Sequence, residues 1–174
     1  TGEPVMKKAA GPDIRGLEPD IDPRIEAGLF FPHEGQVDTA GIMRALSGFL
    51  KKSGAELRFN EKAVEVGPNR IVTEKGRRDF DAVADCRGMG SAADLKNLRG
   101  VRGEVLRINA PGVNLRRPVR LMHPRYPIYI VPRPGNDYII GATSVESEDL
   151  STMSVRGALE LLSALYSVTS GFSE

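Results

Sequence analysis

The sequence contains a single cysteine, no tryptophan and no long hydrophobic run. One cysteine, Cys86, cannot form a disulfide within the chain. No apolar stretch approaches the roughly 20 residues that a membrane-spanning helix needs, and no signal peptide opens the chain. These absences predict a protein of the reducing cytoplasm that has no membrane partner.

Neither sign of charge dominates the chain. Its 24 basic and 23 acidic side chains leave a net charge of +1, so no field of one sign covers the molecule to hold a polyanion. The pairs Arg77-Arg78 and Arg116-Arg117 lie in turn-like stretches without interleaved aromatic residues, which is typical of solvated loops. We therefore expect no nucleic-acid partner.

The motifs of hydrolases and metal sites are also missing. Neither G-x-S-x-G nor S-x-x-K occurs in the sequence. His33 and His123 lie far apart, without the cysteine or aspartate support of a recognisable ligand spacing. We expect no metal ion, and we place Cys86 at the buried end of a strand, where cysteine packs more often than it reacts.

What the chain does contain is the composition of one compact, ordered domain, with 40% hydrophobic and 27% charged residues. Apolar residues at helical spacing predict two amphipathic helices. The first follows its N-cap, Asp38, and runs to about Lys52. The second covers residues 155–166, with Ser151 or Thr152 available as its N-cap.

Strands are predicted where short or alternating apolar runs are bounded by turn residues. They mix with helix before residue 92 and follow one another after residue 100, which predicts an α+β fold with an antiparallel sheet. Pro134, Gly135 and Asn136 are the residue types that a tight hairpin needs. An irregular lead-in over residues 1–27, with one helical turn near Ile14 to Leu17, precedes the first strand. The predicted strands are Leu29–Phe31, Ala55–Phe59, Ala63–Val66, Arg70–Thr73, Phe80–Asp85, Glu104–Ile108, Val119–Met122, Ile128–Val131 and Tyr138–Ile140.

The stretch Gly88–Ala93 matches G-x-G-x-x-A, a pattern that in nucleotide-binding folds leads from a strand into a long helix beneath a pyrophosphate. Here only about eight residues separate the glycines from the next break, at Arg99-Gly100-Val101, which is too few for that helix. A simple turn at the end of a strand is the favoured interpretation, and a pyrophosphate site is the alternative.

Four stretches together nevertheless resemble the glycine oxidase and D-amino-acid oxidase family of FAD-dependent oxidoreductases. Their order and spacing match that family from about residue 16 to residue 170, although no single stretch is specific. The four are GLFFPHEGQVD over residues 28–38, FDAVADCRG over 80–88, LRGVRGEVL over 98–106, and YIVPR followed by GAT within 129–143.

The resemblance implies a partial FAD-binding α/β subdomain joined to the antiparallel sheet of a substrate-side domain. Residues 1–35 then hold the lead-in and first strand of the substrate side, residues 36–98 part of the FAD-binding subdomain, and residues 99–174 the substrate-side sheet with a C-terminal helix. The family's N-terminal strand-G-x-G-x-x-G-helix and C-terminal G-x-R-P region are not found in the sequence. We therefore expect an internal piece of a longer protein that binds FAD weakly or not at all.

The resemblance also assigns residues to the cofactor. Val64 aligns with a position whose backbone meets the adenine end of FAD, although a plain strand valine explains it equally well. Cys86, Arg87 and Gly88 resemble the turn that approaches the flavin, where a small residue lets the backbone come close to a ligand. All four assignments therefore concern the backbone more than the side chains.

Tyr129 and Ser144 resemble positions that line the substrate pocket. By strand alternation Tyr129 points opposite to its two neighbours and can face a cavity, and a half-buried strand aromatic is the alternative interpretation. For the parent protein the resemblance implies oxidative deamination of a small amine or amino acid, with hydride transfer to the flavin and no catalytic side chain in this chain. Substrate identity, and the choice between oxidase and dehydrogenase, stay open.

A function of another class is also compatible with the sequence. Strand edges left exposed in such a chain can pair between copies. The alternative to an oxidoreductase is therefore a non-enzymatic binding or self-association module, which would form a homodimer.

Overall fold

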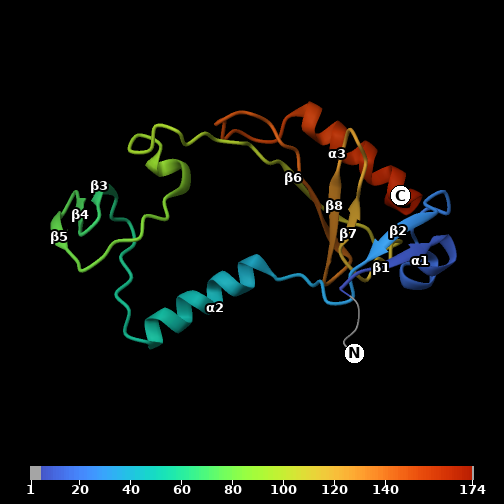
Figure 1. Cartoon of the computed structure of the whole chain (residues 1–174), viewed down its shortest axis with the longest axis horizontal. Helices are drawn as coiled ribbons and strands as arrows, with labels where there is room; N and C mark the ends of the chain where they lie inside the picture. Colours follow the sequence, from blue (N-terminus) through green and yellow to red (C-terminus); the bar gives the residue numbers. More distant parts are fainter. Residues whose placement is uncertain (1–4, 174) are drawn as a thin grey trace. The chain divides into compact units, whose positions relative to one another are not determined.

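The computed structural model of the chain describes residues 5–173 (Figure 1). Contacts between residues group it into two units. The first, here called the discontinuous unit, combines Thr1–Gln36 with Val101–Glu174, and the second, the inserted unit, is Val37–Gly100. No helix within residues 5–173 is long and apolar enough to cross a membrane.

An antiparallel sheet of four strands forms the centre of the discontinuous unit. Its order is β6 (Val105–Asn109), β9 (Asp137–Gly141), β8 (Ile128–Arg133) and β7 (Val119–Leu121). Arg133 pairs with Asp137, so residues 134–136 form the loop between β8 and β9. Gly135 and Asn136 have φ angles of 79° and 61° there, a region that glycine and asparagine tolerate best. The predicted hairpin and the predicted α+β class are confirmed.

One helix, α3 (Val155–Val168), covers one face of this sheet and is followed by the short η2 (Ser170–Ser173) (Figure 1). The predicted helix is confirmed, but its predicted apolar face is not the buried one. That face was Val155, Leu159, Leu162, Leu165 and Tyr166, of which only Leu165 is buried, and the residues that α3 buries are Gly157, Leu161, Ala164, Leu165 and Val168. The core of the unit therefore lies between helix and sheet. Its members there include Ile128, Ile130, Ile140, Leu161, Leu165 and Val168.

The N-cap of α3 differs from the prediction. It is Ser154, whose hydroxyl oxygen accepts a hydrogen bond from the Gly157 amide at 2.9 Å. The predicted caps bind Arg102 instead, since Ser151 Oγ accepts from Arg102 Nη1 at 3.1 Å and the Thr152 carbonyl accepts from Nη2 at 2.6 Å. Both predicted N-cap residues thus bond to Arg102, which is distant in the sequence, and Ser154 caps the helix instead.

The N-terminal segment is more regular than the predicted lead-in. β1 (Lys7–Ala10) pairs with β2 (Ala27–Phe30), and α1 (Gly11–Leu17) lies between them in the sequence. Glu18 is buried after α1 and accepts a hydrogen bond from the Arg116 amide at 2.8 Å. The prediction missed β1 because its partner strand lies beyond the proline-rich stretch.

The inserted unit contains one long helix and a three-stranded antiparallel meander. Its elements are α2 (Thr39–Lys52), β3 (Ala63–Gly67), β4 (Arg70–Thr73), β5 (Gly76–Asp79) and the 3-10 turn η1 (Gly88–Ser91). Two predicted strands, 55–59 and 80–85, are wrong. The third strand of the meander is β5. Residues 80–85 form no strand, because the Phe80 and Val83 amides donate to carbonyls of the β3–β4 turn, at 2.7 and 2.9 Å.

α2 is amphipathic, as its spacing predicts. It follows Asp38, and Gly54 lies just beyond its end with a φ of 81°. None of its residues is buried within the described chain. Ile42, Leu46 and Phe49 are all exposed, so the described residues leave the apolar face of α2 uncovered.

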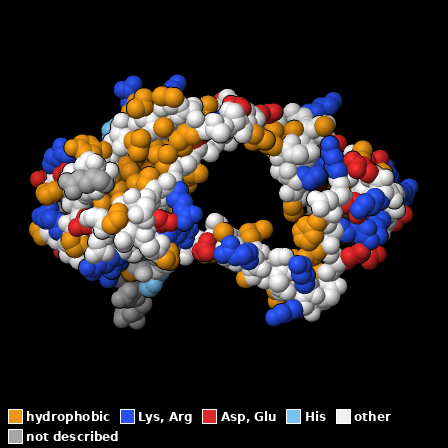
Figure 2. Space-filling model, turned by 180° about the vertical axis from the view of Figure 1, so that it is seen from behind, with side chains coloured by type: hydrophobic (Ala, Val, Ile, Leu, Met, Phe, Trp, Pro, Cys, Tyr) orange, Lys and Arg blue, Asp and Glu red, His pale blue; other side chains and the backbone are white. Residues whose placement is uncertain are grey.

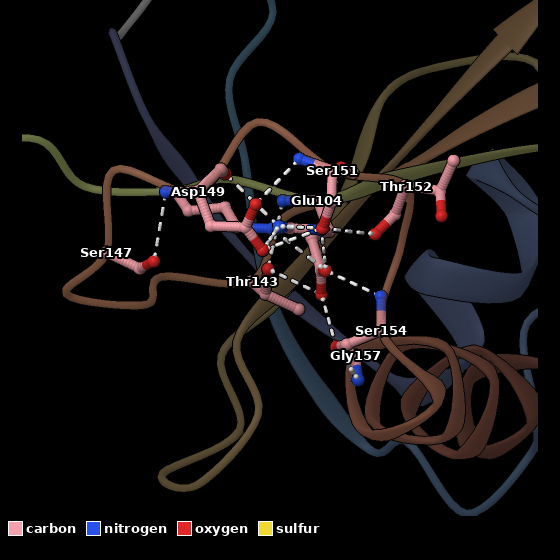
Figure 3. Close-up of polar contacts among 9 residues, drawn as sticks. Glu104, Thr143, Ser147, Asp149, Ser151, Thr152, Ser154 and Gly157 are labelled. Atoms are coloured by element: carbon pink, nitrogen blue, oxygen red, sulfur yellow. Dashed lines mark hydrogen bonds and ion pairs between the residues drawn. The ribbon is translucent and has the colours of Figure 1, made fainter.

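A buried carboxylate, Glu104, joins the start of β6 to the segment that leads into α3 (Figure 3). Its Oε1 accepts hydrogen bonds from the Ser154 amide and from Arg102 Nη2, both at 2.8 Å, and its Oε2 accepts from Ser154 Oγ at 3.1 Å. Thr143 Oγ1 accepts from the Glu104 amide at 2.9 Å. Arg102, Glu104, Thr143 and Ser154 are called the Glu104 network below.

Several forces favour the ionised form of Glu104. The N-terminus of α3 attracts an anion through the helix dipole, and Arg102 supplies a cation. The Ser154 amide, helped by the Ser154 hydroxyl and Arg102, holds the pKa of Glu104 below its usual range against the opposing effect of burial. Gly157 makes room for the carboxylate, since a Cβ at that position would overlap Glu104 Oε2.

Replacing Leu161 by alanine should destabilise the chain, because Leu161 is only 2% exposed in the core between α3 and the sheet. We expect the free energy of unfolding to fall by about 2–5 kcal/mol, measured by urea unfolding followed by circular dichroism. Leu159→Ala is the matched control, because Leu159 lies on the same helix and is 60% exposed. Equal losses in the two variants would contradict the packing of α3 on the sheet.

The Glu104 network should make stability depend on pH. Because the folded-state pKa of Glu104 is lowered, its contribution is present above the unfolded value of about 4.3 and is lost as the pH falls through the folded value. We expect Glu104→Gln to melt below the wild type at pH 7, and the difference in Tm to shrink below about pH 4.3. A constant difference across that range would show that the charge of Glu104 does not matter.

Candidate functional site

The face of the four-stranded sheet opposite α3 is the first candidate site. Tyr129 lies on it with 36% of its surface exposed, while its neighbours Ile128 and Ile130 are buried toward α3. This is the alternation that the sequence predicts. Figure 2 shows hydrophobic side chains gathered over part of the surface of the discontinuous unit, with basic side chains nearby. Such a mixed surface suits a small organic ligand.

A cavity of about 320 Å³ lies beside the first turns of α3 and is the second candidate site. Its walls include Arg125, Ser144, Arg156 and Glu160. Arg156 and Glu160 pair with each other at 2.8 Å, which compensates their charges. Tyr129 is not part of these walls, so the structure does not bring Tyr129 and Ser144 into one pocket.

Val64 lies in a β-bulge of the inserted unit. Ala63 pairs with Thr73 and Glu65 pairs with Val72, so Val64 is the extra residue between two paired positions. Its surface is 64% exposed. A bulge leaves the backbone groups of the extra residue outside the ladder, where a ligand can reach them. The position therefore suits a backbone contact better than a side-chain contact.

The turn at Cys86, Arg87 and Gly88 is open to solvent. Gly88 has a φ of 56°, which favours glycine, and a Cβ there would meet nothing within 4 Å. Cys86 is exposed and not buried as predicted, because residues 80–85 do not form a strand. The prediction that Gly88–Ala93 opens no long helix is confirmed, since only the four-residue η1 begins there.

The Arg87 side chain is occupied within this turn. Its Nη2 lies 2.7 Å from both Asp85 Oδ2 and Asp94 Oδ2. Hydrogen bonds from the Arg87 guanidinium and from the Arg87 backbone amide lower the pKa of Asp85. The three charged groups hold the turn in place. The Arg87 backbone is also bonded within it, since its amide donates to Asp85 Oδ1 at 3.1 Å and its carbonyl accepts from the Gly90 amide at 3.0 Å.

Gly141 lies beside Tyr129 and was not among the predicted site residues. The β8–β9 register pairs Gly141 with Tyr129, and β6 places Val105 opposite Gly141 on the other side. The signal was present in the sequence, because a hairpin centred on Gly135 pairs residues equally distant from it. The pair of Tyr129 and Gly141 was missed because the predicted strand ended at Ile140, one residue too early.

Comparisons with known proteins agree over nearly the whole chain. A family model described as DAO, FAD dependent oxidoreductase, matches residues 3–174. A protein of Rhizobium etli provisionally named thiamine biosynthesis oxidoreductase ThiO is 40% identical over 161 residues, which are 92% of this chain and 46% of that protein. The chain thus spans about half the length of this relative.

Solved structures share the fold. Glycine oxidase from Bacillus cereus has a TM-score of 0.81 at 21% identity, over 97% of this chain and 49% of that one. Glycine oxidase from Geobacillus kaustophilus has a TM-score of 0.80 at 23% identity, over 99% and 48%. L-proline dehydrogenase from P. horikoshii has a TM-score of 0.79 at 14% identity, over 97% and 49%. With the family model matching residues 3–174, the resemblance is confirmed and the chain belongs to the DAO family of FAD-dependent oxidoreductases.

Proposed function

We propose that the protein oxidises a small amine or amino acid in the cytoplasm, and that this chain supplies its substrate-side sheet and part of its FAD-binding region. The observation that carries the proposal is the exposed Tyr129 on the sheet face opposite α3, in a chain of an FAD-dependent family. The fold shared with two glycine oxidases supports an amine as substrate. In this proposal residues 1–35 and 99–174 belong to the substrate side, and residues 36–98 to the FAD side.

The inserted unit fits FAD contacts that are made by backbone groups. The Val64 bulge exposes backbone outside the ladder, and the open turn at Gly88 leaves space for a ligand. We assign Cys86 and Arg87, the two residues before Gly88 in this turn, to the same contact, because the open space at Gly88 would let a ligand approach them. When bound, FAD accepts the hydride from the carbon that bears the amine.

The chain itself has to bind the substrate, orient it and exclude water. We assign Tyr129 to the substrate pocket because its ring lies exposed on the sheet face. Ser144 is assigned to the substrate side as well. It lies three residues beyond the end of β9, next to Thr143, whose hydroxyl belongs to the Glu104 network. No general base is needed from these residues, because the cofactor carries the difficult chemistry.

Self-association is the second candidate, and the uncovered apolar face of α2 favours it. Exposed apolar patches of this kind mark interaction surfaces. A homodimer in size-exclusion chromatography that carries no flavin absorbance would support a self-association module and count against the oxidoreductase. Flavin bound to the protein made from its complete reading frame would support the oxidoreductase, whatever the number of subunits.

Tyr129→Ala should weaken substrate binding in the protein made from its complete reading frame. We expect the KM for glycine, the amine probe, to rise about tenfold with a smaller change in kcat, because the ring contacts bound substrate. Peroxide release or reduction of an artificial electron acceptor measures the rate. Tyr166→Ala is the control, since Tyr166 is an exposed tyrosine on α3. Identical kinetics in both variants would remove Tyr129 from the pocket.

Two substitutions of Val64 distinguish a backbone contact with FAD from a side-chain contact. Val64→Ala keeps the backbone N–H and should leave FAD affinity within about twofold, whereas Val64→Pro removes the N–H and should weaken it about tenfold. Proline is tolerated at bulges, so the meander should still form. Flavin fluorescence titration of the apoprotein measures both variants. A loss of affinity in Val64→Ala alone would show that the side chain makes the contact.

A further inference from the structure

Three strands meet beneath the Tyr129 ring. Gly141 on β9 lies between Tyr129 on β8 and Val105 on β6, and it pairs with both in the ladder. Paired residues project from the same face of a sheet, so all three positions share the face opposite α3. If the Tyr129 side chain leans from β8 toward β6, it therefore has to pass over Gly141.

The space above Gly141 shows that the ring does so. A Cβ built at Gly141 would lie 2.5 Å from the Tyr129 hydroxyl oxygen, 2.6 Å from its Cζ and 2.5 Å from Val105 Cγ1. Real Cβ atoms do not approach other atoms so closely. The Tyr129 ring thus lies flat across β9, with its hydroxyl above Gly141 and its tip next to Val105.

The φ of Gly141 does not lie in the positive range that side chains avoid, in contrast to Gly88 and Gly135. Glycine inside a strand costs stability and gives the sheet no side chain to pack. Its position beneath the ring supplies the missing reason, because aromatic side chains cover strand glycines favourably.

We propose that Gly141 is a positioning residue that keeps the Tyr129 ring flat and so fixes where its hydroxyl and its outer face meet the substrate. The proposal rests on the assignment of Tyr129 to the substrate pocket. A flat ring leaves the volume above the sheet free for a ligand, whereas a ring that stands up would fill it. Gly141 and Val105 thereby set the depth of the pocket and restrict it to small amines.

The test places 3-fluorotyrosine in the protein made from its complete reading frame and follows its ¹⁹F spectrum. The Tyr129 resonance is the one that disappears in Tyr129→Phe. We expect Gly141→Ala to shift this resonance and to raise the KM for glycine about tenfold, with kcat changed less than about twofold. Gly112→Ala is the control, because a Cβ at Gly112 would meet nothing within 4 Å, and it should change neither.

A second variant keeps the test decisive if Gly141→Ala does not fold. Val105→Ala adds no bulk and removes the contact at the tip of the ring, so it should also shift the Tyr129 resonance, whereas Val105→Thr keeps the branched shape and should not. A Tyr129 resonance unchanged in Gly141→Ala and Val105→Ala would overturn the proposal. A shifted resonance with normal kinetics in Gly141→Ala and Tyr129→Ala would keep Gly141 as the support of the ring and overturn the pocket assignment instead.

Discussion

A carboxylate buried beside the first turn of a helix loses the solvation that water provides, and the protein around it has to replace that solvation. The Glu104 carboxylate obtains it from Arg102, in the segment before β6, and from Ser154, at the start of α3. The Glu104 amide also donates to Thr143 Oγ1, at the end of the β8–β9 hairpin. These three parts of the discontinuous unit are therefore fixed to one point. The position of the hairpin end that leads to Ser144 therefore depends on Glu104.

In the same four strands, the side chains of the core and the exposed side chains point to opposite faces of the sheet. Side chains that point toward α3, such as Ile130 and Ile140, form the core, and their neighbours Tyr129 and Gly141 face the other way. Because adjacent residues alternate across a sheet, an insertion of one residue in β8 would exchange the two roles. The hairpin loop at residues 134–136 keeps the register on which both depend.

Local patterns in the sequence predicted the elements that local forces determine. The hairpin follows from its Pro-Gly-Asn loop, and the turn at Gly88 from its distance to the next break. The apolar spacing predicted the existence of α3 but not the face that it buries. Three of the failures involve partners outside the local segment: β1 pairs across the proline-rich segment, Arg102 binds both predicted caps, and residues 80–85 bond to the β3–β4 turn. Gly141 was missed for a similar reason, because its role depends on the Tyr129 ring, which comes from another strand.

The two-segment construction of the discontinuous unit affects how it is made. A ribosome completes β1 and β2 before it begins the inserted unit, and the sheet strands β6 to β9 emerge only afterwards. The bond between Glu18 and the Arg116 amide, like other contacts of this unit, joins residues separated by the entire inserted unit. Such separation raises the contact order and slows folding. The first segment of the discontinuous unit therefore stays exposed while the ribosome synthesises the 64 residues Val37–Gly100, because its partner segment follows them.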